Sequence, residues 1–154
     1  MIIGTIKEKK KFENRVAISP EEVKSYLKSG HQVFIERGAG SLSGFTDKSY
    51  KEAGATISNS KDILKTSDIV IKINCPTPDE SRLINNKSMV VSQISTQNNQ
   101  DSIKILNSRK VSAFALELVP RITRAQDMDI LSSQANLCLL YTSDAADEVW
   151  CVGV

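Results

Sequence analysis

Residues 60–74 read SKDILKTSDIVIKIN, and this stretch decides the fold class. Residues 60–67 have the pattern of a short helix, and residues 68–74 form an almost continuous apolar strand. A strand that is apolar on both sides is typical of a parallel sheet covered on both faces. The helix followed by a buried strand therefore predicts an α/β fold.

The same alternation extends in both directions along the chain. Capping residues mark one helix clearly, with Ser19 as N-cap, Pro20 at the first position, Glu22 at the capping-box position and Gly30 beyond the end. Residues 75–85 predict a proline-marked loop with at most a helical turn. The predicted strands are residues 1–7, 31–36, 55–58, 68–74, 88–94 and 111–117. The pattern predicts an open, doubly wound, mostly parallel sheet of the flavodoxin or Rossmann type.

The overall composition is that of an ordinary soluble domain. Hydrophobic residues make up 40% and charged residues 25% of the 154 residues, and the net charge of +2 is too small to indicate a nucleic-acid partner. No apolar run approaches the roughly 20 residues that span a bilayer. The sequence predicts no metal site, because the spacing of metal ligands is absent from Cys75, Cys138, Cys151 and His31. The expected setting is a reducing cytoplasm.

The composition changes abruptly at Cys138. Residues 138–154 contain no Lys, Arg, Ile or Asn, yet they hold the only Trp and two of the three Cys. The segment CLLYTSDAADE is similar to the in-frame translation of a transposon-based sequencing-library adapter. We therefore interpret residues 138–154 as non-native read-through and exclude them from the fold.

Ligands of open α/β sheets bind beyond the carboxyl ends of the strands, so the polar residues there are candidates. Arg15 follows the first predicted strand, and Lys72 interrupts an otherwise apolar strand. Two cations at this edge would suit the binding of a carboxylate ligand. The alternative is that both side chains are solvated at the ends of their strands. Residues 38–44, GAGSLSG, lack the spacing and position of a dinucleotide fingerprint and predict a tight loop. His31 starts a strand at the opposite end of the sheet.

The strongest candidate is the segment PRITRAQDMDILSS, residues 120–133. On a helix, Gln126, Asp129 and Ser133 share one face and Ser132 lies at its edge. Arg121 precedes the helix, whose N-terminal dipole also favours an anion. A polar ligand site is one interpretation of this face, and a solvated helix surface is the other.

Residues 119–137, VPRITRAQDMDILSSQANL, resemble a segment of the alpha subunits of proton-translocating NAD(P) transhydrogenases. Residues 13–57 and 67–76 resemble the N-terminal domain that these subunits share with alanine dehydrogenases. The resemblance implies hydride transfer between NADH and NADP⁺, coupled to proton translocation in the whole enzyme. It also implies an alpha-subunit homodimer, an NADP-binding beta subunit and membrane subunits, which would hold the protein at the cytoplasmic side of the inner membrane.

The resemblance also implies the roles of particular residues. Arg121, Gln126, Asp129 and Ser132 match the positions that contact NAD(H), and Gln126 would reach toward the NADP(H) of the partner and act as the catalytic residue. The side-chain types fit, because Asp and Ser can satisfy the donors and acceptors of a carboxamide. Direct hydride transfer requires alignment and exclusion of water rather than an acid or base.

The domain organisation follows from the same resemblance. Residues 1–124 would be the N-terminal α/β domain, and residues 125–137 the start of a linker helix toward a second, NAD-binding Rossmann domain. In the family the chain then returns to complete the first domain. We therefore expect an incomplete sheet here, and residues 1–154 to be inactive alone.

Two alternatives stay open. The first is alanine dehydrogenase, a family whose members use an Arg, a Lys and a His around the substrate. Arg15 and Lys72 match the Arg and Lys positions. The His is expected within residues 92–100, which contain none, and the only histidine of the chain is His31. A stand-alone α/β binding module is the other alternative.

The resemblance predicts that residues 1–154 do not bind NADH at micromolar concentrations, because most of the nucleotide pocket would belong to the second domain. A fluorescence titration measures this directly, and tight, saturable binding would contradict it.

Overall fold

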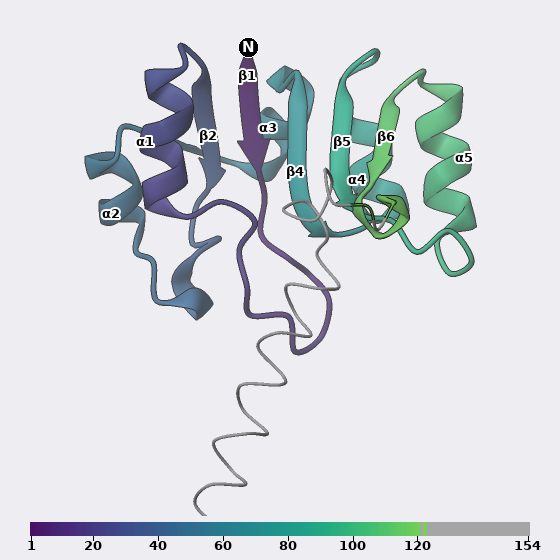
Figure 1. Cartoon of the computed structure of the whole chain (residues 1–154), viewed down its shortest axis with the longest axis horizontal. Coiled ribbons are helices and arrows are strands. Elements are labelled where there is room, and N and C mark those ends of the chain that lie inside the picture. Colours follow the sequence, from purple (N-terminus) through teal and green to yellow (C-terminus); the bar gives the residue numbers. More distant parts are fainter. Residues whose placement is uncertain (121, 123–154) are drawn as a thin grey trace, which may run out of the picture. The chain divides into compact units, whose positions relative to one another are not determined.

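Six parallel strands form the sheet of the computed structural model, which describes residues 1–120 and 122. The strands are β1 (Ile2–Thr5), β2 (Gln32–Glu36), β3 (Thr56–Ser58), β4 (Ile69–Asn74), β5 (Met89–Gln93) and β6 (Ser112–Ala115). Their order is β3-β2-β1-β4-β5-β6, so the direction of winding reverses between β1 and β4 (Figure 1). The predicted open, parallel, doubly wound sheet is confirmed, with the Rossmann order rather than the flavodoxin order.

Five α-helices connect the strands of the described part. They are α1 (Pro20–Lys28), α2 (Asp47–Glu52), α3 (Ser60–Thr66), α4 (Pro78–Leu83) and α5 (Gln100–Ser108), with short 3-10 helices η1 (Ser41–Ser43) and η2 (Leu116–Leu118). The prediction of a strand over residues 111–117 was too long, since β6 ends at Ala115 and η2 begins at Leu116. Among the described residues, no helix has the length and apolarity required to cross a membrane.

The prediction of a loop over residues 75–85 was wrong in part, because α4 lies within it. Thr77 caps this helix and Glu80 completes a capping box, the same arrangement that Ser19 and Glu22 form at α1. Thr-Pro-Asp-Glu carries the same sequence signal as Ser-Pro-Glu-Glu, so the helix could have been predicted. Only the capping residues carry this signal, because a helix of six residues is too short to show a helical period of apolar residues.

The chain divides into two compact units, Met1–Ala115 and Leu116–Val154, and the sheet belongs to the first. The helix predicted from residue 125 to 137 and the segment 138–154 lie outside the described residues. The domain boundaries inferred from the sequence therefore remain predictions.

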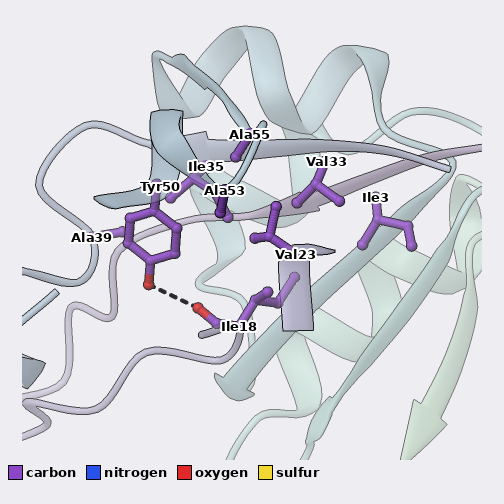
Figure 2. Packing of buried hydrophobic residues seen from close by; sticks show 9 residues of the cluster. All are labelled: Ile3, Ile18, Val23, Val33, Ile35, Ala39, Tyr50, Ala53 and Ala55. Carbon is purple, nitrogen blue, oxygen red and sulfur yellow. Dashed lines mark hydrogen bonds between the residues drawn. The ribbon is translucent and has the colours of Figure 1, made fainter. Parts of the chain in front are cut away.

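Two apolar clusters hold the first unit together, one on each face of the sheet. Figure 2 shows the first cluster, in which residues of α1 and α2 pack against β1 and β2. Its members are Ile3, Ile18, Val23, Val33, Ile35, Ala39, Tyr50, Ala53 and Ala55. The second cluster joins α3 and α5 to the opposite face and comprises Ile6, Ile63, Leu64, Val70, Ile84, Val90, Leu106 and Val111.

Tyr50 is the largest fully buried side chain of the described part. Its hydroxyl donates a hydrogen bond to the carbonyl oxygen of Ile18 at 2.7 Å (Figure 2), and burial raises its pKa to about 12. A Cβ at Gly40 would lie 2.8 Å from the Tyr50 ring, so only glycine permits this approach. The predicted tight loop over residues 38–44 is thus explained by packing on the ring.

The first face is not covered along its whole width. Parallel pairing places Phe114 of β6 beside Val91 of β5, on the same face as the first cluster. Phe114 is 49% exposed and Met89 39% exposed, while α3 and α5 pack on the other face. Within Met1–Ala115, the β5–β6 end of this face therefore lacks a covering helix.

We predict that Tyr50→Phe lowers the free energy of unfolding by about 1–2 kcal/mol, because the buried Ile18 carbonyl loses its donor. Urea denaturation measures this. Tyr26→Phe is the matched control, because the hydroxyl of this half-buried tyrosine has no hydrogen-bond partner among the described residues. Equal effects of the two substitutions would contradict the assignment.

Candidate functional site

A cavity of about 390 Å³ opens where β1, β4 and β5 end. It lies at the carboxyl edge of the sheet, next to the β1–β4 reversal where ligands of doubly wound folds bind. Its walls are polar and comprise Glu8, Lys9, Lys10, Lys72, Asn74, Cys75, Thr77, Gln93, Ser95, Asn98 and Asn99. The cavity is the candidate site of the described part.

Lys72 is the buried centre of this wall. It is 2% exposed, and its Nζ lies 2.9 Å from Glu80 Oε2 and 3.9 Å from Glu8 Oε2. A cation in the middle of a strand is tolerated only when it is paired, and here two carboxylates neutralise it. The alternative that Lys72 is a solvated strand end is therefore wrong.

The helix α4 places Glu80 against Lys72. As the third residue of the helix, Glu80 accepts a hydrogen bond from the Thr77 backbone N–H at 3.0 Å with the same Oε2 that meets Lys72. Lys9 approaches the other oxygen at 2.9 Å. Burial raises the pKa of Glu80, but the attraction of Lys72 and these hydrogen bonds outweigh it and lower the pKa below its usual value. Glu80 is therefore a carboxylate at neutral pH.

Glu8 ties the end of β1 to the irregular end of β4. Its Oε1 accepts a hydrogen bond from the Ile73 backbone N–H at 2.8 Å, at the point where the β4–β5 register shifts between Ile71 and Asn74. The carboxylate thus satisfies a backbone donor in the irregular part of the strand. Its side chain is almost fully buried beside Lys72.

Arg15 does not join Lys72 in the cavity wall. Its guanidinium forms two hydrogen bonds to Glu13, at 2.7 and 2.8 Å, and its side chain remains 54% exposed. Hydrogen bonding to Arg15, together with a hydrogen bond from Asn74, lowers the pKa of Glu13 to about 2. A series of contacts through Glu13, Asn74 and Glu8 links Arg15 to Lys72.

The end of β5 and the segment after it supply amides and a hydroxyl to the cavity, and no imidazole. Gln93, Ser95, Asn98 and Asn99 line it, and Asn99 also donates to the Ile94 carbonyl at 2.8 Å. The only histidine, His31, precedes β2 at the amino edge, the end predicted from the sequence. The described walls can bind a polar or anionic group by hydrogen bonds and charge.

Comparison with known proteins places these features in a family. Residues 4–138 match the family "Alanine dehydrogenase/PNT, N-terminal domain". The chain belongs to this family. The Glu8–Lys72–Glu80 network and the cavity therefore lie in its N-terminal domain.

Individual relatives include both enzymes of the family name. An NAD(P) transhydrogenase alpha-subunit polypeptide of Rhodospirillum rubrum is 42% identical over 143 residues, which cover 89% of this chain and 37% of the relative. The crystal structure of the Sinorhizobium meliloti transhydrogenase superposes with a TM-score of 0.84 at 39% identity, covering 89% of this chain and 41% of that one. The alanine dehydrogenase of Methanococcus maripaludis is 35% identical, covering 81% and 34%. The chain thus spans little more than a third of these relatives.

The predicted nucleotide contacts lie outside the described residues and stay predictions. They are Arg121, Gln126, Asp129 and Ser132.

The sequence analysis missed the acidic part of the site. The sequence did contain a signal for the pairing of Glu80 with Lys72, because a capping-box Glu eight residues after a strand Lys can reach back to that Lys. Glu8 and Glu13 carried none, because only the β1–β4 pairing brings them to β4.

We predict that Glu80→Gln lowers the free energy of unfolding by roughly 3 kcal/mol, because it removes a carboxylate from the buried Lys72. Asp79→Asn is the matched control on the same helix. Asp79 pairs with Arg82 at 2.8 Å, but both side chains are exposed, so the loss should stay below about 1 kcal/mol. Chemical denaturation of both variants tests this, and equal losses would refute the structural role of the buried pair.

Proposed function

We propose that this chain is the N-terminal part of an NAD(P) transhydrogenase alpha subunit. The observation that carries the proposal is the 42% identity over 89% of the chain to such a subunit, against 35% over 81% for the alanine dehydrogenase. The whole enzyme would transfer hydride between NADH and NADP⁺ and couple this to proton translocation.

The chemistry of the cavity supports the same choice. Oxidation of an amino acid requires a group that accepts a proton, and histidine is the commonest. The wall formed by the end of β5 and the segment after it offers Gln93, Ser95 and two asparagines instead. Hydride transfer between two nicotinamides moves no proton at the reacting carbons, so a wall of amides is compatible with it. We assign Arg15 and Lys72, which are both paired with carboxylates of this chain, to the architecture of the site.

The nucleotide-facing roles belong to the proposal as well. Arg121, Asp129 and Ser132 would orient the carboxamide and phosphates of NAD(H), and Gln126 would align the two nicotinamides. NADH supplies the hydride, so the task of these residues is to hold the rings close and exclude water. NADP(H) would be held by the beta subunit.

The assembly follows from the same proposal. The alpha subunit would form a homodimer and attach to membrane subunits from the cytoplasmic side of the inner membrane. Residues 1–154 alone would be inactive, because the remaining nucleotide pocket would be contributed by segments that correspond to the later regions of the longer relatives.

Reciprocal chimeras test this proposal. Residues 1–137 replace the matching segment of the Rhodospirillum rubrum subunit in one chimera and that of the Methanococcus maripaludis alanine dehydrogenase in the other. We expect the first to reduce NADP⁺ analogues with NADH at a rate near that of its parent. The second should lose about 10²–10⁴-fold in alanine oxidation, because the expected histidine is absent.

Two controls define the outcome. Gln126→Ala in the first chimera should slow hydride transfer by about 10²-fold through misalignment, without a comparable change in NADH affinity. Restoring the native segment of the alanine dehydrogenase should restore its activity. An inactive first chimera combined with an active second one would favour the alternative, alanine dehydrogenase.

A further inference from the structure

A second cavity, of about 510 Å³, lies at the N-terminal end of α5. Its walls are residues 97–102 and Pro78, and it shares Asn98 and Asn99 with the candidate site. The helix begins after the loop that follows β5, so this cavity opens at the same carboxyl edge of the sheet (Figure 1). We call it the helix-end cavity. Its described walls contain none of the residues of the network around Lys72.

The first turn of α5 has no side-chain cap. Asn99 is the N-cap residue, but its side-chain amide donates to the carbonyl oxygens of Ile94 and Ser95, at 2.8 and 3.4 Å. The backbone N–H groups of residues 100–102 cannot bond within the helix, and no other described residue accepts from them. These N–H groups therefore remain available at the wall of the helix-end cavity. The dipole of the nine-residue helix adds a partial positive charge there.

A buried hydroxyl is the second, independent indication of a ligand. Ser102 is 2% exposed and lines the helix-end cavity, and its side chain forms no hydrogen bond with another described residue. A buried hydroxyl without a partner is unfavourable, and such groups call for an explanation. A ligand that presents oxygen atoms would satisfy this hydroxyl together with the N–H groups of the first turn.

The arrangement of the donors favours a phosphate group. Three N–H groups and a hydroxyl approach from one helical turn, and a phosphate has oxygens in several directions, whereas the two oxygens of a carboxylate lie in one plane. The N-terminus of a helix is also a common place for phosphate to bind. The ligand class that these donors fit best is therefore a phosphate.

The charge of the walls limits the charge of that ligand. The described walls contain no Lys or Arg, and they include Asp101, whose side chain is 84% exposed and lies 3.8 Å from Lys104. The helix dipole attracts an anion, while the Asp101 carboxylate repels it. A doubly charged phosphate would be repelled more strongly than a singly charged one. The walls therefore favour a phosphate that carries a single charge.

We propose that the helix-end cavity binds a singly charged phosphate group, such as that of a phosphate diester. The N–H groups of residues 100–102 and the Ser102 hydroxyl would donate to its oxygens. The inference goes beyond the proposed function and does not depend on it, because only residues of Met1–Ala115 carry it. Asn98 and Asn99 belong to both cavities, so a ligand held here would lie beside the candidate site.

NMR titration of the ¹⁵N-labelled 154-residue chain with dimethyl phosphate, a singly charged diester, tests the proposal. The N–H signals of residues 100–102 should shift and saturate at millimolar concentrations. Inorganic phosphate, which is mostly singly charged at pH 6 and doubly charged at pH 8, should bind at least about threefold more weakly at pH 8.

Three variants complete the test. Ser102→Ala should weaken diester binding about fivefold or more, because a donor to a charged group is lost. Ser108→Ala is the matched control on the same helix, since its exposed hydroxyl donates to the Ile105 carbonyl at 2.7 Å, and affinity should be unchanged. Asp101→Asn should strengthen binding about twofold or more, because it removes the repelling charge.

Thermal unfolding checks that Ser102→Ala still folds, as expected for an alanine within a helix. The inference is overturned if the signals of residues 100–102 show no saturable shift with the diester. It is also overturned if Ser102→Ala binds as tightly as the unaltered chain, or if Asp101→Asn fails to bind more tightly. Binding is read without hydride transfer, so this test and the chimera test of function can fail independently.

Discussion

The buried ion pair between Lys72 and Glu80 is the constraint around which the carboxyl edge of the sheet is organised. A lysine in the centre of a parallel sheet requires compensation, and almost no solvent reaches it. Glu80 can supply its charge only because a capping box starts α4 directly after β4. Glu8 adds a second charge and satisfies the irregular end of β4 at the same time. All three elements that carry this network also contribute residues to the cavity wall or lie beside it.

The network also fixes which groups are available for chemistry. Lys72 and Arg15 each face a carboxylate of this chain, at 2.9 and 2.7 Å. The cavity therefore presents its amides, Thr77 and the more exposed Lys9 and Lys10 rather than two unpaired cations. Such a wall positions polar groups well, and its described residues include no imidazole for proton transfer.

The sequence predicted what depends on local pattern. All six strands were placed by their apolar runs, and α1 by its caps, because these features act within a few residues. The acidic partners of Lys72 could not be placed in the same way. Glu8 and Ile73 are 65 positions apart and meet only because β1 and β4 are neighbours. Arg15 was a candidate to join Lys72 in a carboxylate site, with a solvated side chain as the alternative, and Glu13, two residues away, pairs with it instead.

The exposed part of the sheet links the fold to the proposed function. Parallel sheets are stable when both faces are covered, yet Met89 and Phe114 remain exposed on the face that α1 and α2 cover elsewhere. The relatives extend well beyond the matched region, which amounts to 37–41% of their length. A further apolar segment packed on the open β5–β6 surface would be stabilised by burying Met89 and Phe114.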